Sequence, residues 1–229
     1  MTFLAAVTNW ENMDIEIKLP GVKLGIVEGH GVTVEALHPD LTKLLDEVCA
    51  HKQKEFTVES LAEAEPIRVV RALFRGWGMD PSKYRPASEA LLRRVVQGKG
   101  LYRVSNVVDI GNLVSIETGW PLGCYDRSRI DEPAALRHGL PGESYEGIGK
   151  KTWNLEGRPV LADPAGPFGS PISDSTRSMI TASVKDVVIV IYIPEKSPDA
   201  TAESATKRLC ERLAAFAGAS ATQSAIRRP

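Results

Sequence analysis

The stretch from Ser105 to Asp126 (SNVVDIGNLVSIETGWPLGCYD) constrains the fold most, because it specifies a helix, the end of that helix and the next strand. Its apolar residues approximate helical spacing; they are Val108, Leu113, Val114 and Ile116. Gly119 and Pro121 are typical of a helix end. The sequence therefore predicts an amphipathic helix that passes through a tight turn into a strand around Tyr125.

Three polar residues of this helix, Asp109, Asn112 and Ser115, follow one another at intervals of three. On a helix they are expected to point roughly to one side, away from the apolar stripe. Polar groups gathered beside a glycine turn suit a ligand site. However, Asp and Asn near a helix start are more often caps. The pattern alone leaves both interpretations open.

The remaining segments predict the α/β class, α+β in the stricter sense. Strands are expected around Tyr125, Trp153, Pro159 and Val187, in one mixed central sheet flanked by helices. The unbroken apolar run 187–193 is typical of a strand buried on both faces. Periodicity and stop signals predict the other helices, at 39–52, 57–65, from 66 to a stop at 76–78, at 88–97 and at 201–217.

Near the N-terminus, segments 14–19 and 22–27 flank a Pro-Gly turn and predict a two-stranded edge. His30 lies between two glycines, and either an exposed turn or a functional loop explains it, with the exposed turn favoured. The tail after Gly218 is expected to be frayed.

Composition restricts the class of protein. A chain of 229 residues with 43% hydrophobic and 25% charged residues forms a sizeable core, and one globular unit is expected. The net charge of −1 shows no overall basic excess. Three widely spaced cysteines indicate neither disulfides nor zinc, and fit a reducing cytoplasm. No signal pattern, membrane span, metal motif or cofactor fingerprint is found, so no metal and no cofactor are expected.

Positive charge is nevertheless concentrated in one part of the chain. The residues concerned are Arg68, Arg71, Arg75, Lys83, Arg85, Arg93, Arg94, Lys99 and Arg103. Solvated helix faces with i,i+4 ion pairs explain such a segment. A phosphate-facing surface explains it equally well, because Trp77 and Tyr84 lie among the charges and suit a single-stranded nucleic-acid end.

The segment from Asp163 to Ser175 is rich in Gly, Pro, Ser and Asp, and it is expected to be a loop without regular structure. Gly166 and Gly169 would let its backbone N–H groups approach a ligand. A simple surface loop is the alternative. Cys124, in the central stretch, is either a nucleophile or a small packed residue, and packing is favoured.

The central stretch resembles the core motif of the B3/B4 domain, which carries the editing site in the beta subunit of bacterial phenylalanyl-tRNA synthetase. The matching residues are Asn106, Val108, Asp109, Asn112, Val114, Gly119, Pro121, Leu122, Tyr125 and Asp126. Segments 157–163, 166–170 and 173–176 continue the resemblance, which covers roughly 67–194. It divides the chain into N-terminal strands and helix (1–66), a B3/B4-like core (67–199) and a C-terminal helix and tail (200–229).

The resemblance implies hydrolysis of the ester that joins a wrong amino acid to tRNA, with mischarged tRNA as partner and neither DNA nor a membrane. The implied catalytic residues are Asn112, Ser170 and Asp174. Implied substrate-binding residues are Ser115, Gly123, Cys124, Gly166, Gly169, Ser173 and Ser175. Implied tRNA-binding residues are Arg71, Arg75, Lys83, Arg85, Arg93 and Arg94. Amide donors are expected from the 166–170 segment.

Two positions depart from the family pattern: Pro171 stands where an acidic residue is expected, and Gly123 where a histidine is expected. Asp174 is then the nearest carboxylate. These departures keep two functions open. One is a free-standing deacylase that edits mischarged tRNA in trans. The other is a non-catalytic module that binds tRNA or an amino-acid-like molecule. A hydrolase of another amino-acid ester or amide is a weaker third. The amino acid, the tRNA and the oligomeric state are not specified.

Overall fold

The computed structural model describes residues 12–229, so the first eleven residues of the expected N-terminal segment lie outside the description. The α-helices are α1 (Pro39–Glu55), α2 (Glu65–Gly76), α3 (Ala87–Val96), α4 (Asn106–Thr118) and α5 (Asp199–Ala217). Short 3-10 turns are η1 (Ser60–Ala62), η2 (Arg127–Arg129) and η3 (Thr176–Ser178).

The strands belong to three sheets. An antiparallel sheet has the order β10-β2-β9-β3, with β10 (Ala221–Arg227), β2 (Val22–His30), β9 (Asp186–Pro194) and β3 (Leu122–Asp126). A mixed sheet has the order β1-β4-β7-β8, with β1 (Ile15–Ile17), β4 (Ala134–His138), β7 (Pro159–Asp163) and β8 (Gly166–Gly169). The third is the hairpin of β5 (Ser144–Gly147) and β6 (Lys151–Asn154).

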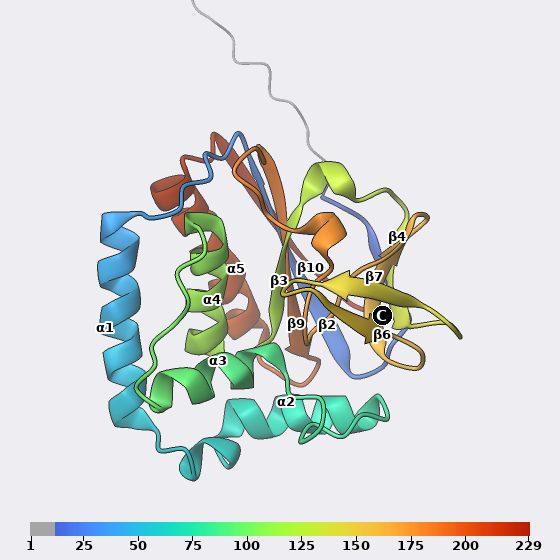
Figure 1. Ribbon diagram of the computed structural model, residues 1–229, viewed down its shortest axis with the longest axis horizontal. Helices are drawn as coiled ribbons and strands as arrows, with labels where there is room; N and C mark the ends of the chain where they lie inside the picture. Colours follow the sequence, from blue (N-terminus) through green and yellow to red (C-terminus); the bar gives the residue numbers. More distant parts are fainter. Residues whose placement is uncertain (1–11) are drawn as a thin grey trace, which may run out of the picture.

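The antiparallel sheet lies in the middle of the molecule, with α4 and α5 on one side and the mixed sheet and the β5–β6 hairpin on the other (Figure 1). Every residue of β2 is buried. Gly25 and Gly29 of β2 let α5 approach closely, because an added Cβ would lie 3.0 Å from Thr206 Cγ2 and 3.0 Å from Leu213 Cδ1 respectively. The main core lies on both faces of the antiparallel sheet, since its buried residues come from the helices on one side and from the mixed sheet on the other.

Helix α4 begins and ends as the sequence predicts. The Ser105 side chain accepts a hydrogen bond from Val108 N, and Gly119 ends the helix with φ +74°. However, α4 is buried on nearly all sides, since it packs against α1, α3, α5 and β3. The predicted amphipathic character is therefore wrong: Asp109 and Ser115 are buried rather than presented on a polar face.

The α+β class is confirmed, and most helices lie within a few residues of their predicted bounds. The expected helix 57–65 is the exception, because only the 3-10 turn 60–62 forms there and residue 65 already belongs to α2. The strands depart further from expectation. The segments around Tyr125, Trp153, Pro159 and Val187 are divided among three sheets. β1 and β2 do not pair with each other, because β1 joins β4 and β2 lies between β9 and β10.

Three further expectations are wrong. His30 is 8% exposed rather than in an exposed turn, and its Nδ1 lies 3.1 Å from Asp186 Oδ1. The tail is not frayed, since 221–227 pair with β2 along its length. The segment 163–175 begins with regular structure, because β8 pairs with β7 across a register shift at Leu161/Ala162. An edge strand tolerates Pro167, which donates no ladder hydrogen bond.

Candidate functional site

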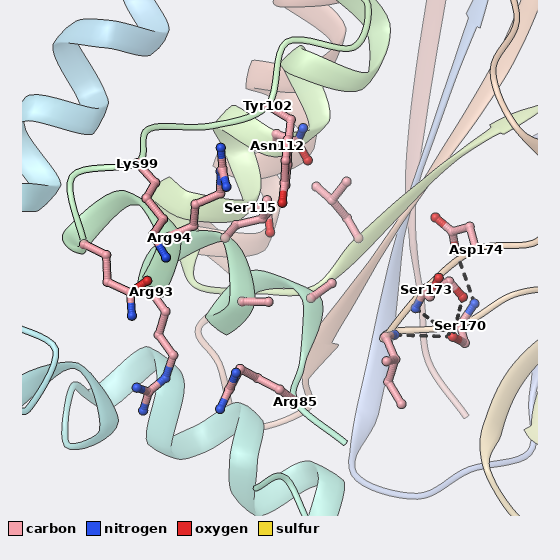
Figure 2. A pocket seen from close by; sticks show the side chains of 16 residues that line it. Arg85, Arg93, Arg94, Lys99, Tyr102, Asn112, Ser115, Ser170, Ser173 and Asp174 are labelled. Carbon is pink, nitrogen blue, oxygen red and sulfur yellow. Dashed lines mark hydrogen bonds between the residues drawn. The ribbon is translucent and has the colours of Figure 1, made fainter. Parts of the chain in front are cut away.

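A cavity of ≈ 580 Å³ lies between α3, α4 and the segment 170–174 (Figure 2). One side, which we call the cationic wall, consists of Arg85, Arg93, Arg94, Lys99 and Tyr102. The opposite side, the loop wall, consists of Ser170, Ile172, Ser173 and Asp174. Asn112 in the middle of α4, Ser115 in its last turn and Leu122 at the start of β3 also line the cavity. The backbone joins the walls as well, because Ala87 N donates to Pro171 O at 3.0 Å.

Asp174 is the carboxylate of the loop wall. Its Oδ1 accepts hydrogen bonds from Tyr125 Oη at 2.7 Å and from Ser170 N at 3.3 Å. The side chain is half-buried and lines the cavity. Burial raises the pKa of Asp174 to about 7, although both hydrogen bonds oppose the rise. A carboxyl group with this pKa accepts or releases a proton near neutral pH.

Tyr125 holds Asp174 in place through the hydrogen bond that its hydroxyl group donates. Its ring packs edge-on against Phe168, with 5.2 Å between ring centroids, and its side chain is fully buried. A Cβ added at Gly123 or at Gly169 would overlap the Tyr125 side chain. The two glycines are therefore explained by the space that the tyrosine needs, and neither belongs to the cavity lining.

Hydrogen bonds within segment 170–174 hold the loop wall in place. Ser170 Oγ donates to Ser173 O at 2.7 Å and accepts from Ile172 N and Ser173 N. Pro171 has no N–H group, and Ser170 N is bonded to Asp174. The N–H groups of 170–173 are thus engaged within the loop. The expectation that amide donors come from this segment fails for Ser170, the member of 166–170 that lines the cavity.

Helix α4 contributes an unengaged amide. Asn112 lines the cavity, and among residues 12–229 no hydrogen bond joins its side chain to another protein group. Ser115 also lines the cavity, but its hydroxyl donates to Trp120 O at 2.8 Å. Asp109 lies outside the cavity lining, and its carboxylate accepts from Val104 N at 3.1 Å. Of the three polar residues, Asn112 is the one whose side chain is available to a ligand.

The cationic wall is built on a buried carboxylate that sequence reasoning did not single out. Glu89 is fully buried, and Arg71 binds it through two hydrogen bonds of 2.8 and 2.9 Å. Arg93 Nε lies 2.9 Å and Arg85 Nε 3.6 Å from Glu89 Oε1. Burial alone would raise the pKa of Glu89, but the hydrogen bonds and charges of Arg71 and Arg93 lower it overall. The spacing of residues 85, 89 and 93 was the available signal.

The rest of the basic segment is divided. Arg94 and Lys99 line the cavity, whereas Arg71, Arg75 and Lys83 do not. Arg71 is engaged with Glu89, Arg75 is exposed on α2, and Lys83 lies over the Tyr84 ring at 5.5 Å from its centroid. The structure therefore brings Arg85, Arg93 and Arg94 of the predicted tRNA-binding set to the cavity.

The structure places Cys124, Ser175 and Gly166, which were also predicted to bind substrate, outside the cavity lining. Cys124 is buried, and an added Cβ at Gly111 would lie 2.6 Å from its Sγ. Burial raises the pKa of the Cys124 thiol, which agrees with packing rather than with a nucleophile. Ser175 caps η3 by accepting from Arg177 N at 3.1 Å, and Gly166 O accepts from Arg177 Nη2 at 3.0 Å.

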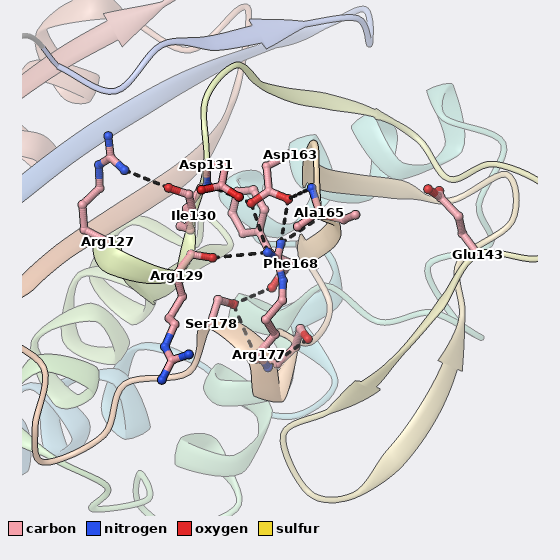
Figure 3. A network of polar contacts seen from close by, with 12 residues as sticks. Arg127, Arg129, Ile130, Asp131, Glu143, Asp163, Ala165, Phe168, Arg177 and Ser178 are labelled. Atoms are coloured by element: carbon pink, nitrogen blue, oxygen red, sulfur yellow. Dashed lines mark hydrogen bonds and ion pairs between the residues drawn. The ribbon is translucent and has the colours of Figure 1, made fainter.

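Arg177 is the centre of the network that fixes this region from behind (Figure 3). Its guanidinium binds both carboxylate oxygens of Asp163, at 2.9 and 3.1 Å. Asp163 also accepts from the backbone N–H groups of Asp131 and Ala165. Ser178 Oγ donates to Phe168 O at 2.7 Å. These contacts hold β8 and η3, and with them the two ends of the loop wall.

Within residues 12–229, no helix is long and apolar enough to span a bilayer. In the same part of the chain, no group of three or more His, Cys, Asp or Glu residues is arranged to hold a metal ion.

The fold and the cavity define an α+β domain whose pocket joins a cationic wall to a hydrogen-bonding wall. A family model described as B3/4 domain matches residues 70–218. The chain therefore belongs to the B3/4 domain family.

Relatives of the chain are beta subunits of phenylalanine–tRNA ligase. That of Chromobacterium violaceum is 31% identical over 110 residues, which are 46% of this chain and 14% of the relative. That of Streptomyces avermitilis is 36% identical over 93 residues, 40% of this chain and 11% of the relative. The chain thus matches about one seventh or less of their length.

Among solved structures, an N-terminal fragment of the phenylalanyl-tRNA synthetase beta subunit from Pyrococcus horikoshii aligns with 95% of this chain and 52% of the fragment. Its TM-score is 0.41 and its sequence identity 16%. The resemblance of the central stretch to the synthetase beta subunit is confirmed by the family match and by the curated relatives.

Proposed function

We propose that this domain hydrolyses the ester of mischarged aminoacyl-tRNA in trans. One observation supports the proposal most: a single cavity joins four cationic side chains to Asp174 and Asn112. The cations suit the phosphates of an RNA end, and the carboxylate with the amide suits the attached acyl group. The relationship to synthetase beta subunits agrees with a tRNA partner.

In the proposed reaction, Asp174, Asn112 and Ser170 have separate roles. Asp174, ionised, takes a proton from a water molecule as the water oxygen attacks the ester carbonyl carbon. Asn112 Nδ2 donates to the carbonyl oxygen, where negative charge develops. The bond between the carbonyl carbon and the ribose oxygen then breaks, and the ribose oxygen takes up the proton. Ser170, which orders the loop wall, acts on the position of Asp174.

A second function is favoured by the satisfied N–H groups of the loop wall. A loop whose N–H groups are engaged internally offers no backbone oxyanion hole. Gly123 has no side chain, and Tyr125 fills the adjacent space. A module that binds tRNA or an amino-acid-like molecule without hydrolysis would keep the cavity and dispense with the oxyanion hole.

Deacylation of a panel of correctly and incorrectly charged tRNAs separates the two functions. We expect release of at least one amino acid by the wild-type protein and a loss of about 100-fold or more in Asn112→Ala and Asp174→Asn. Asp14→Asn is the matched control, because Asp14 is exposed and lies outside the cavity lining. Binding of charged tRNA without release by the folded wild-type protein would contradict the deacylase and support the module.

A further inference from the structure

Tyr102 is an exposed aromatic residue at the edge of the cavity. It lies in the connection between α3 and α4, it lines the cavity, and 58% of it is accessible to solvent. The Arg94 guanidinium carbon lies 3.9 Å from the centroid of its ring. The ring and the guanidinium are therefore stacked, an arrangement that fixes two long side chains at the cavity edge.

The stack with Arg94 covers one side of Tyr102, and 58% of the residue remains accessible to solvent. Figure 2 shows Tyr102 and Arg94 on one side of the cavity and Ser170, Ser173 and Asp174 on the other. A planar group that enters the cavity can therefore contact the exposed part of the ring, on the side opposite to Asp174.

The charge beside the ring is not balanced by the protein. No ion pair joins Arg94 or Lys99 to an acidic group within residues 12–229, and the buried Nε of Arg94 has no hydrogen-bond acceptor there. The other two arginines of the cationic wall share Glu89 instead. Two uncompensated cations thus flank an exposed aromatic face, which favours an anionic ligand that also carries a planar ring.

We propose that Arg94 and Tyr102 form a stacking platform for an unpaired nucleobase, with Lys99 beside it to contact the adjoining phosphate. Stacking on an aromatic face together with backbone phosphate contacts is how proteins bind single strands. A duplex does not fit, because its bases are covered by their neighbours. The platform rests on the proposed function in one respect. If the bound nucleotide carries an acyl group, that group extends from the platform toward Asn112 and the loop wall.

The test compares two RNA trinucleotides that differ in one feature. Both carry the same phosphates, and one ends in adenosine while the other ends in an abasic ribose. Isothermal titration calorimetry at low salt gives the affinity ratio of the pair, and this ratio isolates the contribution of the base. We expect the wild-type protein to prefer the adenosine-terminated probe by about fivefold or more.

Three variants locate that preference. Tyr102→Phe should keep the affinity ratio, because the ring remains, whereas Tyr102→Ala should reduce it to about one. Leu37→Ala is the matched control, since Leu37 is 57% exposed and outside the cavity lining, and it should keep the wild-type ratio. Equal affinity of the wild-type protein for both probes, or an unchanged ratio in Tyr102→Ala, would overturn the platform.

The outcomes also separate the platform from the proposed function. A base preference lost in Tyr102→Ala, in a protein that releases no amino acid from any tRNA, supports the platform and contradicts hydrolysis. Hydrolysis that depends on Asp174, in a protein without base preference, does the reverse. A blunt-ended RNA hairpin, in which the terminal adenosine is base-paired, should bind no better than the abasic probe. Tighter binding of the hairpin would count against the platform.

Discussion

Glu89 below the cationic wall and Asp174 on the loop wall are both carboxyl groups enclosed by protein, but their surroundings differ. Glu89 has three arginine neighbours, and its pKa is lowered in spite of burial. Asp174 has a tyrosine hydroxyl and a backbone N–H, and burial raises its pKa to about 7. Neutral hydrogen-bond donors do not compensate for lost hydration as full positive charges do.

The difference teaches how one cavity combines two tasks. A carboxylate neutralised by arginines holds those arginines in place and leaves a net positive surface, which suits binding. A carboxyl group without a charged partner keeps a proton affinity near neutral pH, which suits proton transfer. The backbone hydrogen bond from Ala87 to Pro171 fixes the position of the two walls relative to each other.

The largest expected effect is on stability, and it separates the two carboxyl groups. Glu89→Gln leaves three arginines without their buried partner and should lower the free energy of unfolding by about 3–5 kcal/mol. Asp174→Asn removes a desolvated charge and should cost less than about 1 kcal/mol at pH 8. Urea unfolding of both variants measures the difference. Equal losses would mean that the two sites do not differ in the way their charges are compensated.

Gly123→Ala tests the support of the loop wall. The new Cβ would overlap the Tyr125 side chain and force it out of place, so we expect a loss of about 1–3 kcal/mol. Gly76→Ala is the control, because no atom lies within 4 Å of a Cβ added there. If Gly123→Ala is as stable as the control, Tyr125 has room to move and does not fix Asp174.

The pH dependence of stability should show Asp174 directly. Its pKa is raised in the folded state, so its contribution to stability is fully present below about 4 and is lost as pH rises to about 7. Asp174→Asn should abolish this decline.

Tyr125→Phe removes a hydrogen bond that lowers the pKa of Asp174. The variant should lower the free energy of unfolding by about 1 kcal/mol and move the Asp174 titration to higher pH. Carbon-13 NMR of the carboxyl group follows the titration, and an unchanged pKa in Tyr125→Phe would contradict the role of the tyrosine.

Local signals in the sequence predict most of the helices, and the family resemblance indicates several cavity residues. Helix bounds depend on caps, prolines and periodicity, all of which are local. Asn112 and Asp174 were found through the resemblance and the scarcity of other carboxylates. The burial of α4 depends on four neighbouring elements, α1, α3, α5 and β3, and no local pattern in the sequence indicates them.

Sheet pairing and the supporting residues depend on contacts between distant parts of the chain. The pairing of 221–227 with β2 joins the two ends of the described chain, and a polar tail gives no sign of it. The sequence predicts Tyr125 only as part of a strand, and its contact with Asp174 is not predictable because the two residues are 49 positions apart. The i,i+4 spacing of Glu89 from Arg85 and Arg93 indicates ion pairs, but its complete burial and its bond to Arg71 depend on the tertiary structure.

The smallest expected effect is on the salt dependence of RNA binding, and it tests which basic residues belong to the binding surface. Each arginine that contacts a phosphate of single-stranded RNA should contribute about 0.7 to the slope of log affinity against log salt concentration. Arg85→Gln should therefore reduce the magnitude of this negative slope by about 0.7, whereas Asp174→Asn should leave the slope unchanged. Arg75→Gln should also leave it unchanged, because Arg75 is exposed on α2 outside the cavity lining. A fall in slope for Arg75→Gln equal to that of Arg85→Gln would show that RNA also follows α2, as the basic segment in the sequence suggested. The binding surface would then extend beyond the cavity, and the contrast between a cationic wall and a loop wall would describe only its inner end.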